Sequence, residues 1–317
     1  MVEILLSYEV GINLFVQSIL FILLSVAFVN TAFILKNYNQ NATTQLQYTL
    51  EKRSYLILSI IKISLIIKII LLPFFTYTLD ELSNIIPGAM CAAGVISANP
   101  YGEPLIVLKI FLVILTMLWL TLNTQDLLSK GFQYFRAKMW FFEFLYILAI
   151  LELLLELLFF TNLTTLNPVS CCSTLYGSAE ALNPLPFQIS ILELIITFYI
   201  TYIALMISAY FKKRYFLLIF SLFFAYLSYY SIVYFFSTYI YQLPTHKCPY
   251  CLLQQEYYSI GYLIYGSLII ALFYSFKVII FKFSKNDFHY VILFYSLFLF
   301  FVSLNFLMYL IVNRTLL

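Results

Sequence analysis

Long runs of apolar residues, separated by short polar stretches, dominate the chain. Eight segments of roughly 20 residues or more are apolar on every side, at about 10–35, 55–78, 105–124, 139–161, 188–211, 215–241, 257–281 and 289–312. A helix of about 20 apolar residues crosses the ~30 Å hydrocarbon core of a bilayer, where only helices and closed barrels satisfy their backbone hydrogen bonds. Barrel strands would be shorter and would alternate in polarity. The pattern predicts an all-α polytopic membrane protein, with residues 1–317 as a single integral membrane domain.

The composition excludes the main alternatives to a membrane protein. Of the 317 residues, 63% are hydrophobic and 10% are charged, whereas soluble domains carry about 25% charged residues. A soluble globular enzyme could not cover its surface with so few charges, and a disordered chain would need low hydrophobicity and high charge. The net charge of +3 is small and dispersed, so it gives no support for nucleic acid as a partner.

Lys and Arg residues give the orientation. Twelve lie in the loops after the first, third, fifth and seventh segments: Lys36, Lys52, Arg53, Lys130, Arg136, Lys138, Lys212, Lys213, Arg214, Lys277, Lys282 and Lys285. The opposite side holds Lys247 and Arg314. Because basic loops stay in the cytoplasm, both termini and the loops at about 79–104, 162–187 and 242–256 are expected outside. We expect a bacterial inner membrane, with these loops in the periplasm.

All five cysteines fall in these outer loops or at their edges. They are Cys91, Cys171, Cys172, Cys248 and Cys251. Outside the cytoplasm, thiols are exposed to oxidation and to metal ions. Structural disulfides would explain most of them, but an odd number leaves one thiol over.

The sharpest motif is Thr245-His-Lys-Cys-Pro-Tyr-Cys251, directly ahead of the seventh segment. Pro249 suits the first turn of a helix, so Cys248 is expected at the N-cap, where the positive helix end stabilises a thiolate. This interpretation makes Cys248 the nucleophile and Cys251 the resolving thiol. A structural disulfide, or half of a metal site, is the alternative.

The segment Cys248-Pro-Tyr-Cys-Leu-Leu-Gln-Gln255 matches glutaredoxin over four residues, but this chain has no room for a soluble βαβ fold. It resembles more closely the Cys-x-x-Cys segment of DsbB-type and vitamin K epoxide reductase-type membrane thiol oxidases, where the pair opens a transmembrane helix on the outer face. The resemblance implies a relay from a periplasmic or lumenal protein to a quinone. The loop cysteines of such a relay would be drawn from Cys91, Cys171 and Cys172.

A soft-metal site is a second possibility. The adjacent Cys171 and Cys172 could form a strained, easily reduced ring, or present two thiolates to Cu(I), Hg(II) or Zn(II). The candidate ligands in the three loops are Met90, Cys91, Cys171, Cys172, His246, Cys248 and Cys251.

Ionisable residues inside apolar segments are functional candidates, because each costs about 2.5–3.5 kcal/mol to insert. Glu152 and Glu156 are four residues apart and share a helix face, and Lys68 is expected at about their depth. These three form a candidate proton relay, or else a neutralising structural pair. Lys109 and Glu193 lie close enough to the outer boundary to snorkel.

These observations favour a membrane thiol–disulfide oxidoreductase that relays electrons between an exoplasmic partner protein and a membrane acceptor such as quinone. Two alternatives stay open. One is soft-metal transport or delivery, with copper as the expected ion and a metal-carrying protein as the partner. The other is a non-catalytic accessory subunit of a membrane complex.

Overall fold

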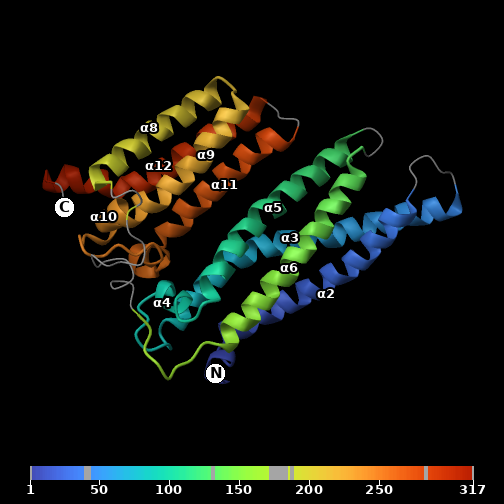
Figure 1. Ribbon diagram of the computed structural model, residues 1–317, viewed down its shortest axis with the longest axis horizontal. Coiled ribbons are helices and arrows are strands. Elements are labelled where there is room, and N and C mark those ends of the chain that lie inside the picture. Colours follow the sequence, from blue (N-terminus) through green and yellow to red (C-terminus); the bar gives the residue numbers. More distant parts are fainter. Residues whose placement is uncertain are drawn as a thin grey trace. The chain divides into compact units, whose positions relative to one another are not determined.

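The computed structural model describes residues 2–38, 44–129, 133–170, 185, 189–281 and 285–315. Within these ranges the regular structure is helical and contains no strand (Figure 1). Eight helices are long and apolar enough to cross a membrane. Among the described residues the predicted all-helical fold is confirmed, and so is the presence of eight helices long and apolar enough to span a membrane. The orientation of the termini stays a prediction.

The long helices match the apolar segments within a few residues at most ends, although the second helix begins ten residues earlier than predicted. They are α2 (Tyr8–Asn37), α3 (Gln45–Leu82), α5 (Gly102–Leu128), α6 (Phe135–Thr161), α8 (Ile191–Tyr210), α9 (Arg214–Ser231), α11 (Ile260–Ile280) and α12 (Lys285–Asn313). The sixth span continues from α9 through a π-helical turn, η2 (Ile232–Phe236), into α10 (Ser237–Tyr241). Short elements between them are α1 (Val2–Leu5), α4 (Ala92–Ile96), and the 3₁₀ turns η3 (Cys251–Leu253) and η4 (Gln255–Tyr257).

The helices group into two compact units. Unit 1 contains Met1–Thr78 and Asn99–Thr164, and unit 2 contains Leu79–Ala98 and Thr165–Leu317. Unit 1 thus comprises α2, most of α3, α5 and α6, and unit 2 comprises α8, α9 with its continuation, α11 and α12. The hydropathy pattern shows no boundary between them, and the expectation of a single membrane domain stays a prediction.

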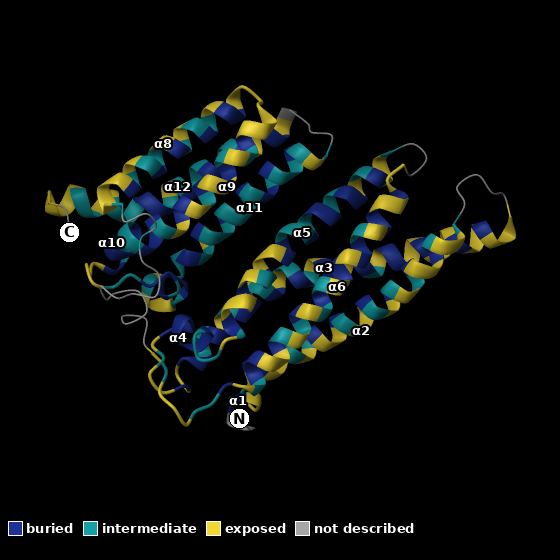
Figure 2. Ribbon diagram, viewed as in Figure 1, coloured by how far each residue is buried: buried dark blue, intermediate teal, exposed yellow. Residues whose placement is uncertain are grey.

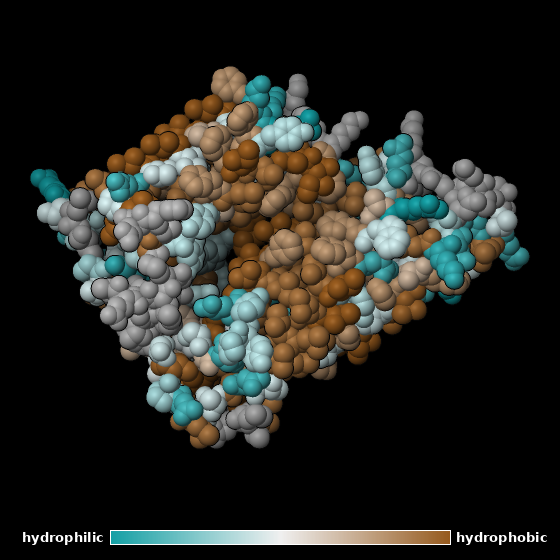
Figure 3. Space-filling view, viewed as in Figure 1, coloured by the Kyte–Doolittle hydropathy of each residue, from teal (hydrophilic) through white to brown (hydrophobic). Residues whose placement is uncertain are grey.

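Each unit has an apolar core and an apolar outside. In unit 1 the core surrounds Trp119 and Phe142, and in unit 2 it includes Phe198, Phe224 and Phe298, whose rings are in contact. Figure 2 shows exposed positions repeating along the outward faces of the helices, and hydrophobic residues cover these flanks in Figure 3. Exposed apolar flanks of this extent are suited to a lipid bilayer.

Candidate thiol site

Three cysteines from two separate segments meet in unit 2. Cys91 lies between α3 and α4, and Cys248 and Cys251 lie between α10 and α11. Their Sγ atoms all lie within 4.8 Å of one another, and Cys91 Sγ is 3.5 Å from Cys248 Sγ. All three side chains are buried, with at most 2% of their surface exposed, and all three are present as thiols. We call these three residues the thiol cluster.

His246 lies at the edge of the thiol cluster. Its Nε2 atom is 3.3 Å from Cys251 Sγ, and its ring packs against the ring of Tyr241 with 4.4 Å between centroids. The imidazole is half-buried. At this distance it can give a proton to the Cys251 sulfur or take one from it, or share a metal ion with it.

Tyrosine hydroxyls hold the Cys-x-x-Cys segment from both flanking helices. Tyr241 Oη donates to the Cys248 carbonyl over 2.5 Å, and Tyr265 Oη donates to the Pro249 carbonyl over 2.6 Å. Gly261, in the first turn of α11, brings the helix against Leu252: a Cβ atom there would lie 2.9 Å from the Leu252 carbonyl carbon and oxygen. These contacts fix the segment on the end of the helical bundle.

The segment that carries Cys91 is held by a glycine and a glutamine. Gly88 has φ +83°, a left-handed conformation that favours glycine, and a Cβ atom there would lie 2.4 Å from the Val169 carbonyl oxygen. Gln254 Nε2 donates to Asp80 Oδ1 over 2.9 Å and to the Met90 carbonyl over 3.2 Å. Gln254 therefore ties the two cysteine-bearing segments together.

The expected N-cap position of Cys248 is wrong. The helix α11 begins at Ile260, Cys248 lies in irregular backbone, and Pro249 and Tyr250 form a bend ahead of the 3₁₀ turn η3. The Cys248 and Pro249 carbonyls accept hydrogen bonds from Tyr241 and Tyr265, and the segment does not extend the helix. Cys248 is therefore not the N-cap of α11.

Of the remaining sulfur candidates, only Met90 belongs to the part of the chain that the structure describes. The Met90 side chain is 65% exposed, and the residue contributes only its carbonyl, to Gln254. Cys171 and Cys172 lie outside the described residues. Of the seven proposed metal ligands, the structure thus brings together Cys91, Cys248 and Cys251, with His246 beside them.

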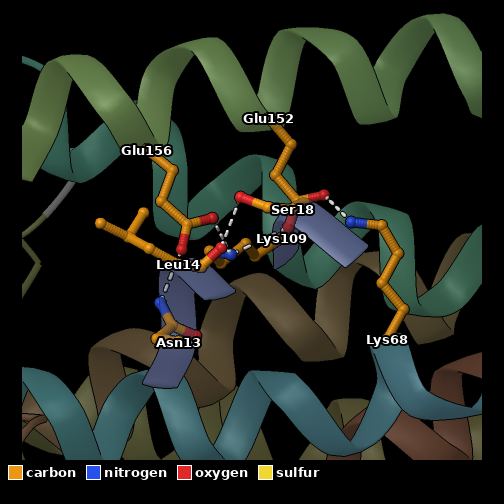
Figure 4. Close-up of polar contacts among 7 residues, drawn as sticks. All are labelled: Asn13, Leu14, Ser18, Lys68, Lys109, Glu152 and Glu156. Carbon is orange, nitrogen blue, oxygen red and sulfur yellow. Dashed lines mark hydrogen bonds and ion pairs between the residues drawn. The ribbon is translucent and has the colours of Figure 1, made fainter. Parts of the chain in front are cut away.

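A separate cluster of buried charges lies in unit 1, where Lys68, Glu152 and Glu156 were expected to meet. Lys68 is ion-paired to Glu152, and Lys109 lies between Glu152 Oε1 at 2.9 Å and Glu156 Oε2 at 2.8 Å (Figure 4). Asn13 Nδ2 donates to Glu156 Oε1 over 2.6 Å. We call these five residues the charge cluster; none is more than 8% exposed.

The expectation that Lys109 snorkels is wrong, since it is 4% exposed and bridges two glutamates. Glu193 is exposed and forms a capping box with Ser190 at the start of α8, and its place near the outer boundary stays a prediction. The sequence contains a signal for each of these contacts. The Ser-x-x-Glu spacing at 190–193 is typical of a capping box. The second buried carboxylate of α6 needs a second lysine to be neutralised, which indicates Lys109.

Comparison with protein-family models, with curated proteins and with solved structures finds no match to this chain. The functional argument therefore rests on the site itself.

Proposed function

We propose that this protein is a membrane thiol–disulfide oxidoreductase whose working group is the thiol cluster. The single observation that carries the proposal is the 3.5 Å separation between Cys91 Sγ and Cys248 Sγ, with Cys251 in the same cluster. Reacting atoms about 3–3.5 Å apart are close to the geometry of attack. When Cys248 and Cys251 form a disulfide, the Cys91 sulfur lies beside the sulfur it would attack.

The exchange balances through these three sulfurs. A Cys91 thiolate attacks Cys248 of the Cys248–Cys251 disulfide, the Cys91–Cys248 bond forms, and Cys251 leaves as a thiolate that takes a proton. His246, 3.3 Å from Cys251 Sγ, is placed to supply that proton. In the reverse direction Cys251 attacks Cys248 and releases Cys91.

Net oxidation needs an electron acceptor outside the chain. Oxidation of the Cys248–Cys251 dithiol to a disulfide releases two electrons and two protons, which convert a quinone to a quinol. Because the three thiols are buried, a small apolar molecule from the bilayer suits them as the electron acceptor. We propose that an exoplasmic redox protein supplies the electrons, and that the cluster faces the periplasmic side of a bacterial inner membrane.

Thiol trapping tests this function. Membranes that contain the full chain with Cys171→Ser and Cys172→Ser are reduced, exposed to a soluble quinone, quenched in acid and alkylated. We expect two of the three remaining thiols to become protected, and Cys248→Ser to leave only the weaker protection that Cys91 and Cys251 give each other. Three thiols that stay alkylatable after quinone treatment would contradict the proposal.

A thiophilic metal centre is the second candidate function, because a donor set of three sulfurs and one imidazole nitrogen is convergent and buried. Tetrahedral Zn(II) with three Cys and one His is a common closed site, and thiolates also select Cu(I). Cys91, Cys248 and Cys251 lie within 4.8 Å of one another, and His246 contacts Cys251. These four donors would fill all four coordination positions of a tetrahedral ion and leave none open for water or a substrate.

Metal analysis separates the two candidates. A metal centre predicts about one zinc or copper ion per purified chain and its loss in both Cys91→Ser and His246→Ala. Thiol exchange predicts no bound ion at that stoichiometry and quinone-dependent protection of Cys248 and Cys251. Bound metal together with thiols inert to quinone would replace the redox function by the metal function.

A further inference from the structure

Tyr241, the last residue of α10, contacts two groups of the thiol site at once. Its side chain is buried, with 6% of its surface exposed. Its Oη atom donates to the Cys248 carbonyl over 2.5 Å, and its ring lies against the His246 ring with 4.4 Å between centroids. Tyr241 therefore touches both the cysteine that would be attacked and the histidine that would supply the proton.

An exposed turn brings His246 back onto the Tyr241 ring. The His246 amide donates to the Leu243 carbonyl over 3.2 Å. Pro244 stands at the second position of this turn, where its fixed φ is favourable. Residues 242–245 are all exposed, so the turn contributes little to the core and mainly sets where His246 lies.

The Tyr241 ring is itself held by contacts other than the one with His246. Its hydroxyl is bonded to the Cys248 carbonyl, and the Tyr257 ring packs against it with 4.5 Å between centroids. A buried ring that is fixed in this way offers the imidazole a surface of defined orientation. Against this surface, His246 Nε2 lies 3.3 Å from Cys251 Sγ. Without the ring, the half-buried imidazole could turn away into another staggered rotamer.

We propose that Tyr241 is a positioning residue of the thiol exchange: its ring directs His246 to Cys251, which makes Cys251 the thiol that leaves. The inference rests on the proposed redox function. An attacking thiolate forms a bond to Cys248 Sγ, the Cys248–Cys251 bond breaks, and its electron pair goes to Cys251 Sγ, which takes a proton from His246 Nε2. Tyr241 neither gives nor takes a proton. It acts through His246, because a proton donor displaced by about 1 Å loses much of its effect.

The reduction of the Cys248–Cys251 disulfide by 2-mercaptoethanol tests the proposal. The full chain is used without its other three thiols, through the changes Cys91→Ala, Cys171→Ser and Cys172→Ser. The remaining pair is oxidised with diamide, reduced by 2-mercaptoethanol at one fixed pH, quenched in acid at intervals and alkylated. The electrons pass from two molecules of 2-mercaptoethanol, which become a disulfide, to Cys248 and Cys251, which become thiols.

Three variants give the expected pattern of rates. His246→Ala should slow the reduction about 10²-fold, as removal of a general acid typically does. Tyr241→Leu should slow it by a similar factor, because the ring that directs His246 is gone. Tyr241→Phe keeps the ring and loses only the hydroxyl, so it should recover most of the rate that Tyr241→Leu loses.

Combination with His246→Ala separates positioning from a general disturbance of the fold. If Tyr241 acts through His246, Tyr241→Leu should slow the reduction no further in the His246→Ala chain. Tyr265→Leu is the matched control, since Tyr265 Oη donates to the Pro249 carbonyl of the same segment over 2.6 Å. Any slowing that Tyr265→Leu causes should multiply with that of His246→Ala. Pro244→Gly loosens the exposed turn without altering the core, so it replaces Tyr241→Leu if that chain does not fold.

The outcomes distinguish this inference from the proposed function, because the assay contains no quinone. An unchanged rate in His246→Ala, or slowing by Tyr241→Leu that multiplies with that of His246→Ala, would overturn the positioning role. The same holds for Pro244→Gly where it takes the place of Tyr241→Leu. Quinone-dependent protection of the thiols together with either result would leave the redox function standing. Coupled effects of Tyr241 and His246 without protection by quinone would instead overturn the redox function and keep the positioning role.

Discussion

At the scale of single residues, the structure shows which polar side chains have partners. The hydropathy pattern identifies Glu152, Glu156 and Lys68 as buried, because their depth follows from the helix ends. It does not identify Lys109 as the bridge between the two glutamates, because depth alone does not say which way a side chain faces. Likewise the Cys-x-x-Cys spacing identifies Cys248 and Cys251, whereas the contact between Cys91 and Cys248 depends on how two distant loops pack.

Lys109→Met should destabilise unit 1 strongly. Removing one partner from a buried ion pair typically costs about 3–5 kcal/mol, and Lys109 neutralises both Glu152 and Glu156. Thermal unfolding in detergent measures the effect. Lys62→Met, on the exposed face of α3, should change stability by less than about 0.5 kcal/mol.

Adding Glu156→Gln to Lys109→Met should recover part of the loss, because the second change removes the stranded charge. Equal unfolding temperatures for Lys109→Met and Lys62→Met would contradict the reported ion pairs.

Gly88→Ala should displace the segment that carries Cys91. An L-residue at this left-handed φ costs about 1–2 kcal/mol, and its Cβ would lie 2.4 Å from the Val169 carbonyl oxygen. We expect a lower unfolding temperature and less Cys91–Cys248 disulfide after mild oxidation. An unchanged disulfide yield would show that the Gly88 contact does not position Cys91.

At the scale of elements, helix type and number follow from the sequence, but helix faces do not. Lipid and core are both apolar, so the apolar residues on the outward and inward sides of α2 or α6 are similar. Only a few buried polar residues, such as Asn13 on α2 and Glu152 and Glu156 on α6, mark the inward face. The sequence marks a helix end more clearly where polar residues cap it, as Ser190 and Glu193 do at the start of α8. The N-cap prediction for Cys248 is wrong because Pro249 fits a first helical turn and a loop equally well, and the tyrosine contact that keeps Pro249 in a loop is tertiary.

Two glycines in α11 form a matched pair. Gly261→Ala should push the helix away from Leu252, where a Cβ would lie 2.9 Å from backbone atoms, whereas nothing lies within 4 Å of a Cβ at Gly266. Gly266→Ala should be neutral or stabilise by about 0.5–1 kcal/mol. Thermal unfolding and the rate of Cys248–Cys251 oxidation are the readouts. Similar behaviour of the two variants would contradict the tight packing of η3 on α11.

At the scale of the whole molecule, eight helices suited to a bilayer place the thiol cluster beside helix ends rather than at mid-helix. The distribution of Lys and Arg predicts that these ends are exoplasmic. Alkaline phosphatase fused after Leu317 should be active, and green fluorescent protein fused there should not fluoresce. At residues 212–214 the phosphatase should be inactive and the green fluorescent protein should fluoresce. Fluorescence behind Leu317 would reverse the orientation and place the thiols in a reducing compartment.

The most direct test of the central claim is to trap the bond that the thiol cluster should form. In a chain with Cys171→Ser, Cys172→Ser and Cys251→Ala, mild oxidation should join Cys91 to Cys248, since their Sγ atoms lie 3.5 Å apart, and peptide mapping without reduction should recover the linked pair. The matched chain with Cys248→Ala instead of Cys251→Ala should yield less linkage, between Cys91 and Cys251. Recovery of Cys91 and Cys248 as separate thiols in the first chain would contradict the account.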